Sequence, residues 1–181
     1  LEDITDYVAL AGAVFGAFLE EYRLVRGRKR WGLKTPTNEF FADEIFSVHP
    51  DAKFVHVYRN VFSMISSLKK LGWIQPGDQH LARRVIEWNR SLEVLLVNLH
   101  RYRGRYLGIR YENFVEDPKT YLKLICGFLG IDYREEMLEM RGHPGGGTGS
   151  NSAFSASAHT ISPELAKRPV ENLSDHERAI I

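Results

Sequence analysis

The sequence predicts an α/β fold in which helices cover both faces of a parallel, doubly wound sheet. Two observations predict it. Short apolar runs rich in β-branched and aromatic residues occur at 54–58 and 106–111, and the segments between them repeat their apolar residues every three or four positions. The chain has 181 residues, of which 44% are apolar and 26% charged, which suits one domain over residues 1–181. In such folds ligands bind beyond the carboxyl ends of the strands.

The first part of the chain predicts helices and strands in alternation. Apolar residues at helical spacing predict a helix over 7–25, which Gly27 ends. The Trp-Gly-Leu segment at 31–33 is a strand candidate, and the turn and cap that follow predict a helix over 36–46. The run Phe-Val-His-Val-Tyr at 54–58 predicts a strand buried on both faces of a sheet.

The middle of the chain continues this alternation. Helical spacing predicts a helix over 61–71 and a long helix over 81–102. A third strand is predicted at 106–111. A further helix is predicted over 118–129, because a proline occupies its first position and a glycine follows its last residue.

The C-terminal part predicts a short helix near 134–140 and then a Gly- and Ser-rich loop at about 142–162. Ser174 and Glu177 have the spacing of a capping box, which predicts the start of a last helix. Three strands make a thin sheet, and the chain does not begin with methionine. We therefore expect a fragment, or the ordered part of a longer chain, with at least one strand outside it.

Composition excludes several classes of protein. Lys and Arg number 24 against 23 Asp and Glu, so the net charge of +1 gives no field that would attract nucleic acid or an anionic membrane. No apolar run approaches the roughly 18 residues of a membrane helix. Cys126 is the only cysteine, which excludes an internal disulfide and favours a reducing, cytoplasmic location. The seven histidines are scattered outside metal-binding motifs, so no metal site is predicted.

The predicted strand ends carry the candidate binding residues. Arg59 follows the strand at 54–58, and Ser66 and Ser67 lie on the next helix. An arginine fork, hydroxyls and helix-terminal amides together can hold a phosphate. The alternative is an arginine paired with a carboxylate at the rim of the sheet. Tyr111, just past the next strand, can face an adenine or close the core.

Lys34 brings a second cation to the same predicted edge. There its ammonium can neutralise charge that develops on a transferring oxygen. Alternatively, Lys34 belongs to a solvated basic patch, because residues 23–34 hold six basic residues and no acid, and such a patch can contact an acidic acceptor. A second acid-free stretch at 101–110 has the composition of some nucleic-acid-binding segments, but a solvated helix-to-strand connection explains it better.

Together these segments resemble the family of sulfotransferases that use 3′-phosphoadenosine 5′-phosphosulfate (PAPS), in particular its bacterial and Golgi-type members. Lys34-Thr35-Pro36 is similar to the family's lysine-threonine-proline segment. Arg59 is followed eight positions later by Ser67, the spacing of the family's 3′-phosphate motif. The further similar segments, in the family's order, are the strand at 50–60, Ile109–Pro118, Phe128–Ile131, the glycines at 145–147 and Leu173-Ser174.

The resemblance implies a fold like that of the P-loop nucleotide hydrolases and a metal-free transfer of a sulfuryl group. PAPS would be the co-substrate, adenosine 3′,5′-bisphosphate the product, and the hydroxyl or amine of a small molecule, glycan or peptide the acceptor. The resemblance assigns the 3′-phosphate to Arg59 and Ser67 and the adenine side to Tyr111. It assigns stabilisation of the transferring group to Lys34.

The sequence also departs from the family. The first strand and its 5′-phosphosulfate loop are expected before Leu1. Val61 and Ser63 stand where many members carry proline and aspartate, and Pro36 stands where the cytosolic branch has its catalytic histidine. The general base is therefore unassigned. Two other functions remain open: a kinase or other phosphate-transfer relative with the same architecture, and a non-catalytic module that binds nucleotide or acidic glycan.

Overall fold

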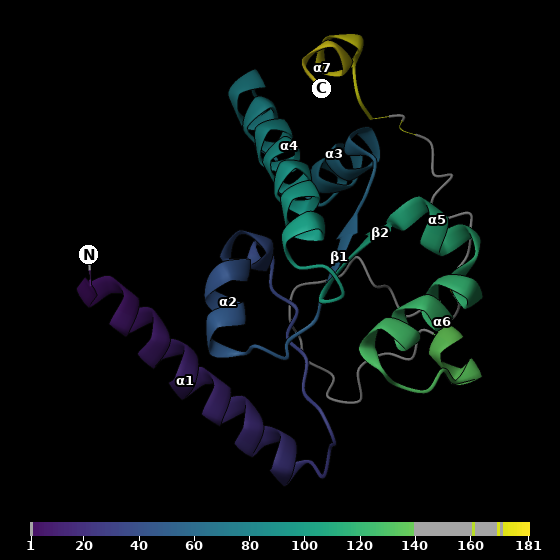
Figure 1. The fold of residues 1–181 in the computed structure, drawn as a ribbon. Coiled ribbons are helices and arrows are strands. Elements are labelled where there is room, and N and C mark those ends of the chain that lie inside the picture. The colour runs from purple at the N-terminus through teal and green to yellow at the C-terminus, as the bar shows by residue number, and fades with distance from the viewer. Residues whose placement is uncertain (1, 140–160, 162–169, 171) are drawn as a thin grey trace.

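The chain folds into helices around a short parallel sheet (Figure 1). The computed structural model describes residues 2–139, 161, 170 and 172–181. The strands of this part are β1 (Phe54–Tyr58) and β2 (Tyr106–Arg110). Its helices are, in chain order, α1 (Glu2–Val25), η1 (Asn38–Phe41), α2 (Ala42–Val48), α3 (Val61–Lys70), α4 (Asp78–Arg101), α5 (Tyr111–Glu116), α6 (Pro118–Leu129), η2 (Glu135–Leu138) and α7 (Asp175–Ile180).

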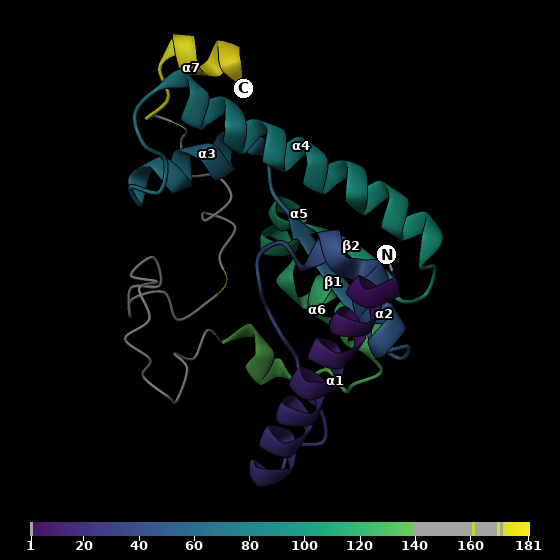
Figure 2. The ribbon, with the colours of Figure 1, turned by 90° about the vertical axis from the view of Figure 1, so that its left-hand side faces the viewer.

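The sheet lies between two groups of helices. β1 and β2 pair in parallel, with Phe54 beside Tyr106 at one end and Tyr58 beside Arg110 at the other. α4 covers one face, and a Cβ built on Gly108 would lie only 3.1 Å from a leucine side chain of that helix. α5 and α6 lie on the other side of the sheet, as Figures 1 and 2 show together. The predicted α/β class, with helices on both faces of a parallel sheet, is confirmed.

Most of the predicted elements are confirmed with small shifts at their ends. The strand predicted at 54–58 occupies those residues, but the prediction that it is buried on both faces is wrong, because Val57 is 55% exposed. The helices predicted at 7–25, 61–71, 81–102 and 118–129 correspond to α1, α3, α4 and α6. The helix predicted next to the Lys-Thr-Pro segment is a 3₁₀ turn, η1, that continues into α2. The short helix predicted after α6 is the 3₁₀ turn η2.

The strand predicted at 31–33 does not form, so that prediction is wrong. Leu33 is 48% exposed, and Trp31 instead packs edge-on against His49, with 5.4 Å between the ring centroids. Three residues with a glycine in the middle have little apolar surface to bury. They have no partner strand within the described residues, so the backbone stays irregular. The loop predicted at about 142–162 lies outside the described residues except for residue 161.

Two apolar cores hold the layers together. The first joins α2, α4 and the sheet, and its buried members are Ala42, Phe46, Leu95, Tyr102 and Tyr106. The second joins α3, α4 and the C-terminal segment, and its buried members are Ile65, Leu81, Val85 and Leu173. Because Leu173 is 6% exposed, the C-terminal segment is an integral part of the second core. Ser174 and Glu177 form the predicted capping box at the start of α7.

Helix α1 contacts the rest of the structure through α2. Its glycines allow a close approach: a Cβ on Gly12 would lie 2.8 Å from Val48, and one on Gly16 would lie 2.7 Å from His49. The other side of α1 leaves large apolar side chains such as Val14 in solvent. None of the helices in the described ranges has both the length and the hydrophobicity that crossing a bilayer requires.

Candidate phosphate site at the carboxyl ends of the strands

Arg59 lies where β1 ends, and Tyr111 lies where β2 ends. The parallel register pairs Tyr58 with Arg110, so the residues that follow them emerge at the same edge of the sheet. The Arg59 guanidinium lies over the Tyr111 ring, with 4.7 Å from Cζ to the ring centroid. Trp88 of α4 donates its indole N–H to the Arg59 carbonyl oxygen at 2.8 Å. The strand end is therefore fixed from α4, and the guanidinium rests on an aromatic face.

The positive charge of Arg59 is not neutralised within the described part of the chain. Its Nε atom is buried and has no hydrogen-bond partner there, and no described carboxylate forms an ion pair with it. A buried N–H without an acceptor is costly, so this atom is a ready donor for an anionic group. Within the described residues, Arg59 therefore does not form the alternative arrangement, an ion pair with a carboxylate at the rim of the sheet.

The carboxylate of Glu112, at the same edge, is engaged elsewhere. It accepts a hydrogen bond from the Asn60 backbone N–H at 2.9 Å and another from Arg110 Nε at 3.2 Å. Partial burial by itself would raise the pKa of Glu112, but these two donors hold the pKa below its ordinary value. Glu112 is thus an ionised anchor for the turn into α3 and a partner for Arg110.

Helix α3 begins directly after this turn. The Asn60 side chain caps it by accepting from the Ser63 N–H at 3.2 Å. The first-turn N–H groups of Val61 and Phe62 have no partner within the helix, as at any helix start. Ser67 follows Val61 by six residues, about 9 Å along the helix axis, and lies on the same side of the helix as Ser63. The Ser67 hydroxyl makes no hydrogen bond to Arg59 or to any other described residue.

Lys34 lies in the exposed loop between α1 and η1. It makes no contact with Arg59 or Tyr111 in the described structure. The loop itself is held before Lys34, because Arg30 donates to the carbonyl oxygens at the end of α6, those of Leu129 at 2.5 Å and Gly130 at 3.0 Å. The structure therefore brings Arg59 and Tyr111 into contact and leaves Ser67 and Lys34 as separate groups.

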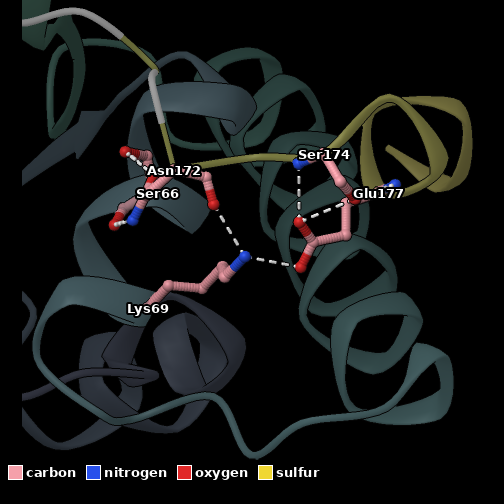
Figure 3. A network of polar contacts seen from close by, with 5 residues as sticks. All are labelled: Ser66, Lys69, Asn172, Ser174 and Glu177. Atoms are coloured by element: carbon pink, nitrogen blue, oxygen red, sulfur yellow. Dashed lines mark hydrogen bonds and ion pairs between the residues drawn. The ribbon is translucent and has the colours of Figure 1, made fainter.

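A clamp on α3, beside Ser67, was missed by the sequence analysis (Figure 3). Ser66 donates its hydroxyl to Asn172 Oδ1 at 2.5 Å, and Asn172 Nδ2 donates to the Ser66 carbonyl oxygen at 2.9 Å. Lys69 Nζ donates to the Asn172 carbonyl oxygen at 2.7 Å and forms an ion pair with Glu177 at 2.6 Å. We call this set of four residues the C-terminal clamp. The capping box at Ser174 was its one sequence signal.

A second polar network was also missed, and it ties the sheet to η1. His56 Nδ1 lies 2.8 Å from the Tyr106 hydroxyl, and its Nε2 lies 3.3 Å from the Ser91 hydroxyl. Ser91 in turn donates to Glu39 Oε1 at 2.9 Å. Burial lowers the pKa of His56, and the negative charge of Glu39 opposes this only in part. No motif or spacing in the sequence marks this network.

The arginine-rich stretch at 101–110 has a structural role. Arg101 forms an ion pair with Asp43 at 2.5 Å, and Arg105 donates to the Pro50 carbonyl oxygen at 2.6 Å. Arg105 also lies over the Phe46 ring, 4.4 Å from its centroid. These contacts support the explanation by a helix-to-strand connection. Over residues 2–139 and the described C-terminal residues, no three His, Cys, Asp or Glu side chains gather closely enough to hold a metal ion.

Comparison with known proteins identifies the class. The family model described as the sulfotransferase family matches residues 2–135, which is most of the chain and includes both strands and the Arg59 edge. The chain belongs to this family.

Two curated relatives come from nematodes, and both are named "Putative protein-tyrosine sulfotransferase". The chain is 24% identical over 110 residues to the Caenorhabditis briggsae protein, covering 58% of this chain and 38% of that one. It is 23% identical over 109 residues to the Caenorhabditis elegans protein, covering 58% and 41%. The chain thus spans about two fifths of the length of the curated relatives it matches.

Two solved structures share the fold. The sulfotransferase domain from the Synechococcus PCC 7002 olefin synthase superposes with a TM-score of 0.59 at 26% identity, over 78% of this chain and 50% of that one. The sulfotransferase domain from the curacin biosynthetic pathway gives a TM-score of 0.55 at 21% identity, over 81% and 59%. The second likeness concerns the fold alone.

Proposed function

We propose that this protein transfers a sulfuryl group from PAPS to a hydroxyl or amine of an acceptor. Membership of the sulfotransferase family supports the reaction class. The observation that supports the donor is Arg59, whose buried Nε has no partner among the described residues and whose guanidinium rests on Tyr111. A phosphate oxygen has the charge and the lone pairs that such a donor requires.

Each predicted site residue has a part in this proposal. Arg59 and Ser67 hold the 3′-phosphate of the nucleotide, and the free N–H groups at the start of α3 add to the positive potential there. Tyr111 lies on the adenine side. Lys34 stabilises negative charge on the transferring group from its loop beside η1.

The reaction is a displacement at sulfur. The bond between the sulfur and the bridging oxygen of the donor breaks, and a bond from the sulfur to the acceptor oxygen or nitrogen forms. The acceptor proton passes to a base that is unassigned in this chain, and adenosine 3′,5′-bisphosphate leaves. The positive charges of Arg59 and Lys34 favour the departing anion, so the chain's own residues supply electrostatic stabilisation.

The names of the nematode relatives favour a tyrosine hydroxyl in a protein or peptide as the first acceptor to test. Glycan and small-molecule acceptors are the alternatives. Assignment to the bacterial and Golgi-type branch and a cytoplasmic location remain predictions from the sequence.

The proposal is tested by titration calorimetry of the 181-residue chain with adenosine 3′,5′-bisphosphate. We expect Arg59→Ala to weaken binding by about 10- to 100-fold, because hydrogen bonds to a charged group contribute about 1.5–3 kcal/mol each. Arg59→Lys keeps the charge but loses the planar fork, so its affinity is expected to lie in between. The control is Arg83→Ala, which removes an exposed arginine of α4 that is paired with Glu87.

Equal affinity of the Arg59→Ala variant and the unmodified chain would contradict the site. Binding of ATP as tight as that of the 3′,5′-bisphosphate would favour the kinase alternative instead. Incubation with PAPS and a tyrosine-containing peptide then separates an enzyme from a binding module, because only an enzyme forms the sulfated peptide.

A further inference from the structure

We propose that Asn172 is a positioning residue for the donor's 3′-phosphate, and this proposal rests on the function proposed above. Through the C-terminal clamp, Asn172 holds α3 at one rotation about its own axis and thereby fixes where Ser67 lies relative to the strand edge. The clamp is drawn in Figure 3, where Asn172 and Glu177 reach α3 from the C-terminal segment. The family model matches residues 2–135, so Asn172 lies outside the matched region.

Helix α3 presents two different sides to its surroundings. Ser66 and Lys69 are three residues apart and therefore share one side of the helix, which faces the clamp. Ser67 follows Ser66 and lies about 100° further around the axis, away from the side that faces the clamp. Because a helix turns as a rigid rod, fixing Ser66 and Lys69 also fixes the direction of the Ser67 side chain.

Asn172 makes three hydrogen bonds to this side of α3. Its side-chain oxygen and nitrogen bind the Ser66 hydroxyl and carbonyl, and its backbone oxygen binds the Lys69 ammonium. Ser66 is only 4% exposed, so these bonds form away from bulk water. If Asn172 is truncated, the buried Ser66 hydroxyl loses its acceptor and the Ser66 carbonyl loses its donor from outside the helix, so α3 gains by rotating these atoms toward water.

Apolar packing alone does not set this rotation. Ile65 is fully buried in the second core and Leu173 packs in the same cluster, which keeps α3 against α4. Aliphatic contacts are non-directional and tolerate a small rotation, whereas the Ser66–Asn172 pair has two bonds of fixed geometry. The expected consequence of losing the clamp is a folded protein with a misplaced Ser67.

The experiment measures calorimetric affinity for adenosine 3′,5′-bisphosphate in Asn172→Ala and in Asn172→Asp. The alanine variant loses both side-chain bonds, and we expect its dissociation constant to rise at least fivefold. The aspartate variant keeps an acceptor for the Ser66 hydroxyl and is expected to recover part of the affinity. The matched control is His176→Ala, which removes a 2.8 Å contact between the same C-terminal segment and Asp78 of α4 and does not touch α3.

Stoichiometry separates positioning from loss of fold. Measurements are made below the unfolding transition seen by circular dichroism, where a positioning role gives weaker binding at an unchanged stoichiometry. If Asn172→Ala does not fold, Ser66→Ala is measured instead, because it removes one of the two bonds between Ser66 and Asn172. Its affinity for the nucleotide is also expected to fall. Unchanged affinity in the folded variant, or an equal loss in His176→Ala, would overturn the proposal. A failure of the proposed function looks different, because the unmodified chain itself would then not bind the nucleotide.

Discussion

Glu177 connects the last helix to α3, and replacing it with glutamine removes its negative charge. One carboxylate oxygen lies 2.6 Å from Lys69 Nζ, and the other accepts from the Ser174 backbone N–H at 2.8 Å. The Lys69 ammonium and then the Ser174 amide lower the pKa of Glu177 from 4.5 to about 2. Glutamine has nearly the same size but only one acceptor oxygen, so Glu177→Gln removes the negative charge together with one of the two acceptor atoms.

The size and pH dependence of the effect follow from this pKa. Expressed fully, this lowering of the pKa would correspond to about 3 kcal/mol. The side chains of Lys69 and Glu177 are 27% and 24% exposed, so water screens the pair and we expect about 1 kcal/mol. The folded chain holds this carboxylate ionised at pH values where the unfolded chain takes up a proton. The contribution is therefore complete above about pH 4.5 and is lost as the pH falls toward 2.

The assay is urea unfolding followed by tryptophan fluorescence, at a series of pH values from 7 to 2.5. Glu177→Gln is expected to be less stable than the unmodified chain by about 1 kcal/mol at pH 7, and the difference is expected to shrink below pH 4.5. The control is Glu93→Gln, an exposed carboxylate of α4 that makes no ion pair with a described residue. The reasoning fails if the two chains are equally stable at pH 7, or if the difference at pH 7 persists undiminished at pH 2.5.

Two further predictions concern the backbone and the buried histidine. Gly130→Ala is expected to lower the free energy of unfolding by about 1 kcal/mol, because Gly130 ends α6 with a φ of 66°, which favours glycine. The midpoint of urea unfolding measures this change. The control is Gly127→Ala, which lies inside α6. His56→Gln is expected to weaken the fall in stability between pH 7.5 and 5.5, because burial lowers the pKa of His56 and the unfolded chain takes up a proton that the folded chain resists. Unfolding midpoints at both pH values test this, and an unchanged slope would contradict it.

The elements that the sequence predicted correctly are those whose signal is local. The run at 54–58 is a strand because its β-branched and aromatic residues favour an extended backbone. Helix α6 has proline at its start and a left-handed glycine after its end. The segment at 31–33 is shorter, has a glycine in its middle, and has no partner strand in the described structure. A strand needs a partner for its backbone groups, and a three-residue pattern does not reveal whether one is available.

The candidate site was predictable in part for the same reason. Parallel strands end at one edge, so Arg59 and Tyr111 had to emerge near each other, and the structure places them in contact. The C-terminal clamp was not predictable, because Asn172 lies 106 positions from Ser66 and an asparagine has no spacing pattern that marks its partner. The His56 network was not predictable for the same reason. His56 contacts Tyr106 of β2 and Ser91 of α4, and Ser91 in turn binds Glu39 of η1.

The strand edge also shows how two arginines come to have different roles. Arg59 and Arg110 stand one residue apart in the register, and the edge offers one described carboxylate, Glu112, whose donors are Arg110 and the Asn60 amide. Arg110 is thereby neutralised, while Arg59 rests on the Tyr111 ring, a contact that orients a guanidinium without occupying its N–H groups. A phosphate that binds Arg59 therefore does not have to displace an ion pair with any described carboxylate, and the ring contact already holds the guanidinium in place. The absence of a described ion pair and the fixed guanidinium both lower the free-energy cost of binding an anion at this edge. The first follows because Glu112 accepts from Arg110 and the Asn60 amide and not from Arg59.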